Sequence, residues 1–235
     1  MNKPLKIDRF SIHYHNKEEL LGLKAEIFSQ HSYYFESRVN NPKIIDAGAH
    51  VGLATLYFKK QYPLCQITAL EPNPLNFKLL EQNVWENDLS DVTCLNVALA
   101  DTAGDKTLYQ DTEQSWLSTS SFHKNAWNGE QSTQPIQVEA ITLSSLLTNP
   151  IDLVKLDIEG AELAVLKEAR AQLHLVKRLF IECHPHSQNN TAEIAELLRS
   201  HHFQINFVKN GAQISEQKAQ HGLVIIEAVN NSNQK

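Results

Sequence analysis

The sequence predicts an α/β fold, a doubly wound and mostly parallel sheet that closes with a C-terminal antiparallel hairpin. Short apolar runs alternate with segments in which apolar residues recur at helical spacing, which is typical of βαβ units. The 235 residues are 42% hydrophobic and 20% charged, a composition that excludes a disordered or fibrous chain. We therefore expect one domain over residues 1–235.

The predicted elements follow one another in regular order. Strands are expected at 43–47, 66–70, 92–99, 151–156 and 179–181, and the closing antiparallel pair at 203–208 and 223–229. A helix is expected from Leu53 to Tyr62, because Pro63 stops it. A second starts at Pro74, since Asn73 is a good N-cap and proline favours the first helical position. Further helices follow the fourth and fifth strands, the last at 192–200.

Two segments lie outside this alternation. Residues 1–40 contain an apolar helical stretch around 20–28 and an aromatic cluster at 33–35, so we expect a helical extension packed on the sheet. Residues 110–135 are polar and carry Trp116, Phe122 and Trp127. A loop of this length inside a compact domain is usually functional or disordered, and its aromatic residues favour a lid or substrate loop.

Charge and cysteine content limit the partners and the compartment. The net charge is −6, which argues against a nucleic-acid partner because phosphate-backbone binding needs a dense Lys/Arg surface. Cys65, Cys94 and Cys183 are far apart and suit free thiols in a reducing compartment. The N-terminal sequence lacks an apolar secretion signal and no apolar run is long enough for a membrane span, so a cytoplasmic protein is expected.

The first strand ends in a glycine turn that indicates a nucleoside-containing cofactor. Ligands of doubly wound sheets bind beyond the carboxyl ends of the strands, where Asp46, Gly48, Ala49 and Gly52 follow the first strand. Gly48 permits a sharp turn close to a ligand and Gly52 a close contact where the helix begins. The spacing is not the G-x-G-x-x-G of pyrophosphate sites. An acid here repels phosphate but suits a sulfonium and its amino group, which favours S-adenosylmethionine over a nicotinamide cofactor.

The next two strand ends fit the remainder of such a cofactor. Glu71 is placed to accept hydrogen bonds from ribose hydroxyls, and Pro72 and Asn73 stiffen the chain where an adenine ring would lie. The third strand ends at Ala98 to Asp101, and Asp101 could accept from the adenine amino group. Each residue also has a simpler interpretation, because glycines often mark an ordinary turn and an acid favours a helix N-terminus. Their succession at three strand ends favours cofactor binding.

The fourth and fifth strand ends carry the candidate catalytic residues. Lys155 and Asp157 share one face of the fourth strand, and Glu159 and Glu162 follow within the next turn. Carboxylates this close raise one another's pKa unless a cation or backbone amides intervene, and Lys155 is the candidate cation.

The fifth strand ends in Glu182, Cys183 and His184, with His186 just beyond. A proton acceptor could come from Asp157, Glu182 or His184, and we hypothesise Asp157 or His184. His184 and His186 could equally be polar loop residues. A Mg²⁺ site made of Asp157, Glu182 and His184 is a weaker alternative, and no metal is expected.

These blocks resemble one known family. The segments IIDAGAHVGLATLYF, ITALEPNPLNFKLLEQNV, LNVALAD, ITLSSLL, IDLVKLDIEGAELAVLKEA and LFIECHP together are similar to FkbM-type methyltransferases over roughly residues 40–185. The resemblance implies adenosylmethionine as cofactor and a class I methyltransferase (Rossmann-like) fold with a seven-stranded sheet. It also implies O-methylation of a hydroxyl on a sugar, a polyketide or a similar small molecule.

The family's motifs also imply roles for individual residues. They would place Asp46, Gly48, Gly52 and Glu71 around the cofactor and Asp157 at the methyl-transfer region. Ser144 departs from the acid or asparagine often found in the family's equivalent of ITLSSLL, and we expect little consequence, since that segment precedes the fourth strand.

Two other functions remain compatible with the residues. A nicotinamide-dependent oxidoreductase on a similar sheet is disfavoured by Asp46 and by the missing third glycine. A non-catalytic scaffold that binds adenosylmethionine would keep the same glycine turn. The acceptor and the oligomeric state do not follow from the sequence.

Overall fold

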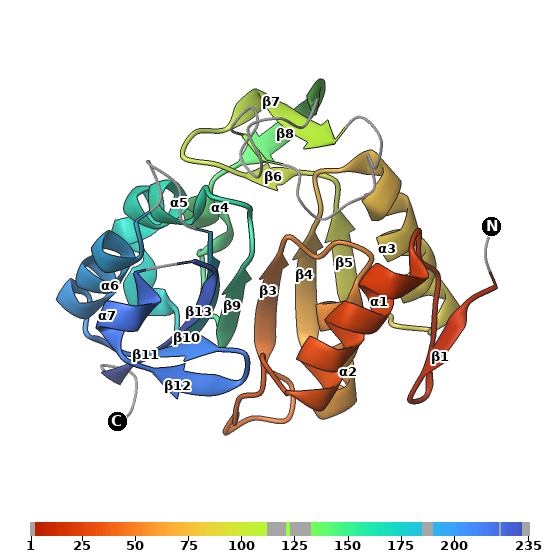
Figure 1. Ribbon diagram of the computed structural model, residues 1–235, viewed down its shortest axis with the longest axis horizontal. Helices are drawn as coiled ribbons and strands as arrows, with labels where there is room; N and C mark the ends of the chain where they lie inside the picture. Colours follow the sequence, from red (N-terminus) through yellow and green to blue (C-terminus); the bar gives the residue numbers. More distant parts are fainter. Residues whose placement is uncertain (1–2, 112–120, 123–132, 185–189, 221, 232–235) are drawn as a thin grey trace.

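The computed structural model describes residues 3–111, 121–122, 133–184, 190–220 and 222–231. In these residues an eight-stranded central sheet has the order β12-β11-β13-β10-β9-β3-β4-β5 (Figure 1). Its strands are β3 (Lys43–Ala47), β4 (Gln66–Leu70), β5 (Val92–Leu95), β9 (Leu153–Leu156), β10 (Arg178–Cys183), β11 (Phe203–Lys209), β12 (Ala212–Ile214) and β13 (Val224–Asn230).

The strand directions confirm the predicted doubly wound sheet. The five neighbouring strands β5, β4, β3, β9 and β10 run parallel to one another. Strand β13 runs antiparallel to both β10 and β11. The expected closing pair is therefore present. The short edge strand β12 adds an eighth strand to the seven that the family resemblance implied.

The third predicted strand, 92–99, was wrong in its extent. The chain leaves the central sheet after Leu95, and Ala98–Leu99 form β6 in a separate sheet. At the break the Asn96 side-chain amide donates to the carbonyls of Glu71 at 2.8 Å and Pro72 at 3.1 Å. These contacts turn the backbone away from β4 at the edge where the candidate site lies.

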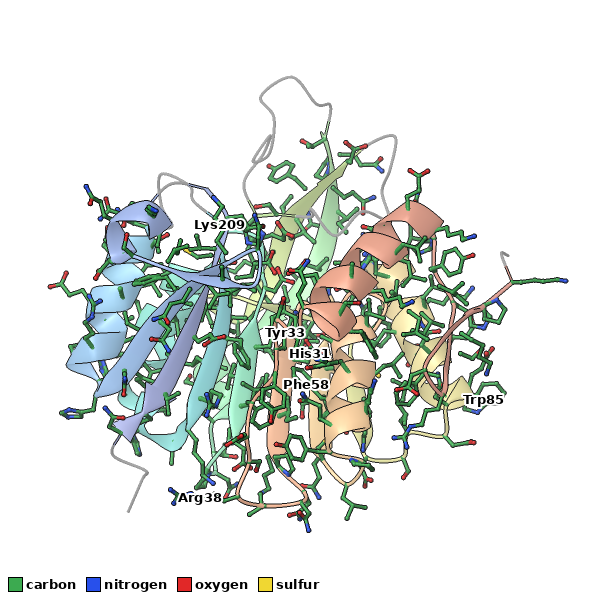
Figure 2. The ribbon with its side chains drawn as sticks, turned by 60° about the horizontal axis from the view of Figure 1, so that its bottom comes forward. His31, Tyr33, Arg38, Phe58, Trp85 and Lys209 are labelled. Carbon is green, nitrogen blue, oxygen red and sulfur yellow. The ribbon has the colours of Figure 1, made fainter. Side chains whose placement is uncertain are left out.

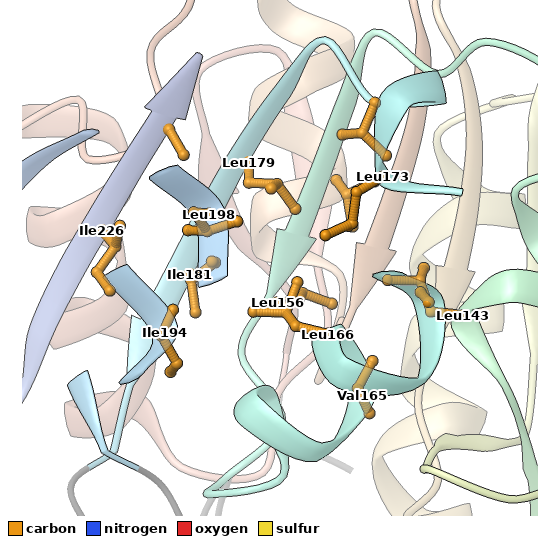
Figure 3. Packing of buried hydrophobic residues seen from close by; sticks show 14 of the residues in the cluster. Leu143, Leu156, Val165, Leu166, Leu173, Leu179, Ile181, Ile194, Leu198 and Ile226 are labelled. Carbon is orange, nitrogen blue, oxygen red and sulfur yellow. The ribbon is translucent and has the colours of Figure 1, made fainter. Parts of the chain in front are cut away.

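Two apolar clusters cover the two faces of the central sheet. The alternation of side chains along each strand puts Ile44, Leu153 and Phe180 in one cluster and Ile45, Val154 and Leu179 in the other. The helices and helical turns are α1 (Lys17–Lys24), η1 (Ala25–Ser29), α2 (Leu53–Gln61), α3 (Pro74–Glu86), α4 (Leu143–Leu146), α5 (Glu162–Glu168), η2 (Ala169–Ala171), η3 (Leu173–Leu175), α6 (Thr191–Ser200) and α7 (Glu216–Ala219). Residues of α4, α5 and α6 pack in the cluster that includes Leu156 and Ile181 (Figure 3).

The N-terminal segment lies on the opposite face and starts with a hairpin that the sequence did not predict. Strands β1 (Leu5–Ile7) and β2 (Phe10–Ile12) pair antiparallel, and α1 and the π-helical turn η1 follow them. Tyr33 and Phe35 then pack in the same cluster as α2. Figure 2 shows Tyr33 and Phe58 together in the middle of the molecule. The expected packing of residues 1–40 on the sheet is observed in the described part of that segment.

A second, three-stranded sheet lies above the carboxyl ends of β3 and β4 (Figure 1). It contains β6 (Ala98–Leu99), β7 (Gly104–Asp111) and β8 (Thr133–Ile141) in the order β6-β8-β7. The predicted loop 110–135 was therefore too long at both ends, because the β7–β8 hairpin pairs as far as Asp111 and Thr133. Ser121 bridges back to Tyr109, and Trp116 and Trp127 lie outside the described residues.

The structure also bears on membrane insertion and disulfides. Within the described residues, each helix is too short or too polar to span a bilayer. Cys65, Cys94 and Cys183 are all free thiols, as expected.

Candidate functional site

The candidate site is built around the turn after β3. The backbone N–H groups of Gly48 and Ala49 both donate to the Leu70 carbonyl, at 3.0 and 2.9 Å, which ties this turn to the end of β4. Gly48 has φ +75°, and a Cβ there would lie 1.8 Å from the carbonyl oxygen of Asp157. Glycine is thus required both by the backbone conformation and by the contact between two strand ends.

Glu71, at the end of β4, is held by backbone donors. Its carboxylate accepts from the N–H of His50 at 2.8 Å and of Asn73 at 2.9 Å, and the residue is 6% exposed. Burial raises the pKa of Glu71 to about 7, although the N–H groups of Asn73 and His50 oppose the shift. The side chain is therefore fixed at the tip of β4 with capacity for further hydrogen bonds.

Lys155 lies between two carboxylates at the sheet edge. Its Nζ is 3.3 Å from Asp46 Oδ1 and 3.3 Å from Asp157 Oδ2, and it donates to the Gly48 carbonyl at 3.0 Å. Burial disfavours its charge, but Asp157 and Asp46 more than compensate and hold its pKa above the ordinary value. This is the cation that the sequence predicted beside the acidic cluster.

A second cation, His184, lies among three glutamates. Its Nδ1 is 3.4 Å from Glu162 Oε1, and its Nε2 is 3.6 Å from Glu159 and 3.8 Å from Glu182. Although burial opposes protonation, the contact with Glu162 and the charge of Glu159 raise the pKa of His184. Glu162 also accepts from the N–H groups of Ile158 and Gly160, at 3.3 and 3.1 Å. The side chain of His184 is therefore engaged by acids that hold it in the protonated form.

The N-terminal segment contributes residues that sequence reasoning missed as site residues. Tyr33 is 2% exposed and its hydroxyl donates to Glu182 Oε2 at 3.1 Å. Its ring lies 5.5 Å from Lys155 Nζ. Burial, reinforced by the charge of Asp157, raises the pKa of Glu26, and burial with the same neighbour raises that of Glu182 to about 8. The sequence showed an aromatic cluster here but gave no signal that one ring faces β10.

Two adjoining cavities follow the strand ends and share Gly48, Glu71, Asp157 and Glu159. The larger, of about 90 Å³, has a mixed polar and apolar lining and is also lined by Leu23, Glu26, Ile27, Tyr33, Ala49, His50, Leu53, Ala54, Lys155 and Glu182. The smaller, of about 40 Å³, is mainly apolar and also lined by Leu70, Pro72, Val97, Ala98, Leu99, Leu108, Phe122 and Ile158. One cavity therefore offers carboxylates and the other a narrow apolar slot.

The structure brings most of the predicted site residues to these cavities, but not all of them. Asp46 is fully buried and accepts from the Thr55 hydroxyl at 2.7 Å, so it faces Lys155 rather than either cavity. Asp101 is outside both linings, and its exposed carboxylate lies 3.6 Å from Lys106.

Three further predicted residues, Gly52, Asn73 and His184, line neither cavity. Asn73 is the buried N-cap of α3. Gly52 caps α2 at φ +92°, where a Cβ would meet Leu80. His186 lies outside the described residues.

The three residues of the alternative Mg²⁺ site lie close enough together to bind one ion. One donor atom each of Asp157, Glu182 and His184 lies within 4.8 Å of the others, the spacing of a possible ion site. Lys155 already places an ammonium against Asp157 at 3.3 Å, so a positive charge is present without a metal.

A larger hollow of about 790 Å³ lies at the opposite ends of the strands. It is lined by residues before β9 and at the start of β10, among them Asp152, Lys177 and Arg178, and by Arg38 (Figure 2). Parallel sheets of this type bind ligands at their carboxyl ends, so the two smaller cavities define the candidate site.

Comparison with known sequences gives one consistent result. A family model described as the methyltransferase FkbM domain matches residues 46–205. The chain is 30% identical over 207 residues to the methyltransferase sdnD of Sordaria araneosa, which covers 76% of this chain and 80% of the relative. It is 27% identical over 139 residues to the hexuronic acid methyltransferase AglP of Haloferax volcanii, with 59% and 54% covered.

Solved structures agree on the fold. The crystal structure of a methyltransferase FkbM from Methylobacillus flagellatus superposes with a TM-score of 0.54 at 15% identity, covering 84% of this chain. This chain spans about half, 47%, of that longer one. The structure of a human methyltransferase 10 domain containing protein superposes with a TM-score of 0.53 at 13% identity. The match covers 94% of this chain and 88% of the human chain.

Proposed function

This chain belongs to the FkbM methyltransferase family, and from that premise we propose that it transfers the methyl group of S-adenosylmethionine to a hydroxyl of a sugar, glycan or polyketide-type small molecule. The pair of cavities joined at Gly48, Glu71 and Asp157 carries this proposal. The name of the AglP relative supports a sugar-type acceptor.

The residues of the two cavities fit the two ends of such a donor. The apolar slot beside Pro72, Ala98 and Phe122 suits a flat, uncharged base. Glu71 reaches the junction of the cavities and has acceptor capacity for ribose hydroxyls. The carboxylates of the larger cavity suit a positively charged group, and Gly48 leaves backbone room there because it has no Cβ.

We assign the proton-accepting role to Asp157 in preference to His184. When bound, the donor supplies a methyl group on a positively charged sulfur, whose C–S bond breaks as the acceptor oxygen forms its C–O bond and releases a proton. Asp157 lines both cavities, whereas His184 lines neither and is held protonated by acids. Lys155 Nζ lies 3.3 Å from the Asp157 carboxylate and holds it in place. A large part of the rate enhancement would therefore come from orienting the acceptor hydroxyl toward the methyl group.

The proposal is tested by binding and turnover in sequence. Calorimetry with S-adenosylmethionine should give a one-site isotherm, and Glu71→Gln should weaken it by roughly 10-fold or more, as for a lost charge-assisted hydrogen bond. Release of S-adenosylhomocysteine is then measured with hydroxylated glycosides and polyketides. Binding without any methyl transfer would identify a scaffold instead of an enzyme.

Asp157→Asn separates catalysis from donor binding. We expect kcat to fall by about 10²–10⁴-fold, the usual effect of losing a general base, with donor affinity much less changed. Asp105→Asn is the matched control, because Asp105 is exposed on β7 and lines neither cavity. Equal turnover of the two variants would remove the role assigned to Asp157.

We also expect methyl transfer to be independent of a divalent metal, because Lys155 already supplies a cation beside Asp157. Turnover is compared before and after exhaustive chelation and dialysis. A loss of activity that Mg²⁺ restores would instead support ion binding by Asp157, Glu182 and His184.

A further inference from the structure

One side of the larger cavity comes from a segment outside the family match. The family model begins at residue 46, and the segment 17–35 before it contributes four lining residues, Leu23, Glu26, Ile27 and Tyr33. We call this segment, which includes α1 and the π-helical turn η1, the N-terminal wall. What the cavity binds therefore depends on residues that the family's motifs do not include.

Aromatic packing holds the N-terminal wall in place. The ring of Tyr33 lies 5.8 Å from that of Phe180 on β10. Phe28, in η1, contacts the ring of Tyr57 on α2 edge-on at 5.3 Å. Rings packed in this way have little freedom, and Glu26 precedes Phe28 by two residues in the same turn. The backbone that carries Glu26 is therefore fixed beside the cavity.

The placement proposed for the donor leaves its amino-acid end to the larger cavity. With the base in the apolar slot and the ribose at Glu71, where the cavities join, the chain beyond the sulfur continues into the larger one. That end carries an ammonium and a carboxylate, and each needs a polar partner once it leaves water. Asp46, the acid expected beside the amino group, lines neither cavity and faces Lys155. The ammonium therefore needs another acid.

Glu26 is the lining acid with the fewest contacts. Within the described residues its carboxylate has neither a hydrogen bond nor an ion pair, although it lines the cavity. The other lining acids each face a described partner: Glu71 two backbone N–H groups, Asp157 the Lys155 ammonium, Glu159 the His184 ring and Glu182 the Tyr33 hydroxyl. Glu26 is thus the acid left to receive a new hydrogen-bond donor.

The surroundings of Glu26 favour a positively charged partner. Burial, reinforced by the charge of Asp157, raises the pKa of Glu26, and Lys155 opposes the shift only in part. The protonated form is therefore favoured in the empty site, whereas a cation beside the carboxyl group favours the carboxylate. An ammonium placed there would gain a charge-assisted hydrogen bond, which is stronger than a bond between neutral groups.

The carboxylate of the amino-acid end also has a partner at this cavity. Leu53 and Ala54, the first two residues of α2, belong to the lining. The N–H groups of a helix's first turn have no partner within the helix and favour an anion. Glu26 and the start of α2 therefore offer opposite charges to the two groups of a zwitterion.

We infer that Glu26 binds the ammonium of the donor's amino-acid end, so that the N-terminal wall belongs to the donor site. This inference rests on the proposed methyl-transfer function. The ammonium is common to S-adenosylmethionine and S-adenosylhomocysteine, so Glu26 should recognise both. Binding of the product is therefore a direct measure of this contact, without turnover.

Two matched ligands isolate the amino group. One is S-adenosylhomocysteine, and the other is its deamino analogue, in which hydrogen replaces the α-amino group. Both are titrated by calorimetry into the unmodified protein near neutral pH. We expect S-adenosylhomocysteine to bind at least about 10-fold more tightly, as for a hydrogen bond between charged groups. Equal affinities would overturn the inference without recourse to any variant.

Variants of Glu26 assign this preference to the N-terminal wall. Glu26→Gln keeps the size of the side chain but removes its charge, so S-adenosylhomocysteine should bind about 10-fold more weakly and the deamino analogue almost unchanged. Glu26→Asp keeps the charge on a shorter side chain and should retain part of the preference. Glu18→Gln, the same change at an exposed position of α1, is the matched control and should retain all of it.

The outcomes separate this inference from the proposed function. If Glu26→Gln behaves like Glu18→Gln, or weakens both ligands equally, Glu26 does not bind the ammonium, although the methyl-transfer function stands. If the unmodified protein binds neither S-adenosylmethionine nor S-adenosylhomocysteine, the proposed function fails and the inference fails with it.

Discussion

Gly48 is the residue where the backbone and the site depend most closely on each other. Replacing it with alanine puts a Cβ 1.8 Å from the Asp157 carbonyl at φ +75°, so both the contact and the conformation become unfavourable. We expect Gly48→Ala to lower the free energy of unfolding by about 2–4 kcal/mol and to abolish donor binding.

Gly22 provides the control for this substitution. It lies inside α1 with open space around its position, so Gly22→Ala should stabilise the protein by roughly 0.5–1 kcal/mol. Denaturant unfolding measures both changes. A stable Gly48→Ala variant that still bound the donor would show that the close approach of β3 and β9 is not needed.

At the residue scale, the sequence predicted which residues lie at the ends of strands better than it predicted where their side chains point. Gly48, Glu71 and Asp157 were predicted from their positions after apolar runs, and the structure brings them together. Asp46 was predicted beside the cofactor, but it pairs in register with Lys155 on the neighbouring strand and is buried against it. Glu26 and Tyr33 escaped prediction because their proximity to the site depends on how the N-terminal segment crosses the sheet.

At the element scale, α3 and its C-cap hold the N-terminal hairpin through two asparagines, Asn83 and Asn87, one turn apart. Asn83 accepts from the N–H of His13 at 2.7 Å and donates to its carbonyl at 3.0 Å. Asn87 makes the same pair of bonds with Ser11, at 2.8 Å each. The side-chain amides thus replace a neighbouring strand along β2, which satisfies the free edge of the hairpin.

Asn83→Ala should therefore loosen the hairpin. Asn83 is fully buried and also donates to the Val51 carbonyl at 2.8 Å, so we expect a loss of about 2 kcal/mol from groups left without partners. Amide hydrogen exchange should accelerate at residues 10–13, while Asn149→Ala, an exposed site, changes neither quantity. Unchanged exchange at residues 10–13 would contradict the proposed support by α3.

The alternation of strands and helices was predictable from the sequence. The two places where the chain leaves this alternation, the N-terminal hairpin and the break after β5, were not. Hydrophobic period and capping residues gave β3, β4 and α2 nearly at their observed bounds and placed the start of α3 correctly. The β1–β2 hairpin was missed because each strand has only three residues, too few for a clear pattern, and β2 is supported by asparagine side chains that are distant in the sequence. The split after β5 was missed because Asn96, which binds the backbone carbonyls of the two residues after β4, lies within an otherwise largely apolar run.

At the scale of the whole molecule, the charge that suits the site works against the stability of the empty protein. Five lining acids converge at one edge of the sheet, and burial raises the pKa of Glu71 to about 7. Because its folded-state pKa lies above the ordinary value, Glu71 binds its proton more tightly when folded. The stability from this group is fully present below about pH 4.5 and is lost as the pH rises through about 7.

Comparison with Glu71→Gln isolates this contribution. Between pH 4.5 and 8 the free energy of unfolding of the unmodified protein should fall, relative to that of the variant, by about 3 kcal/mol, at 1.36 kcal/mol per pKa unit. The difference in slope is read from denaturant unfolding at several pH values, since Glu71→Gln also removes an acceptor from the N–H groups of His50 and Asn73. Saturating S-adenosylmethionine should reduce the slope of the unmodified protein alone, because hydrogen bonds donated to a carboxylate favour its charged form. Parallel curves with and without the donor would mean that Glu71 does not contact it, and the cavity junction would then need another ligand.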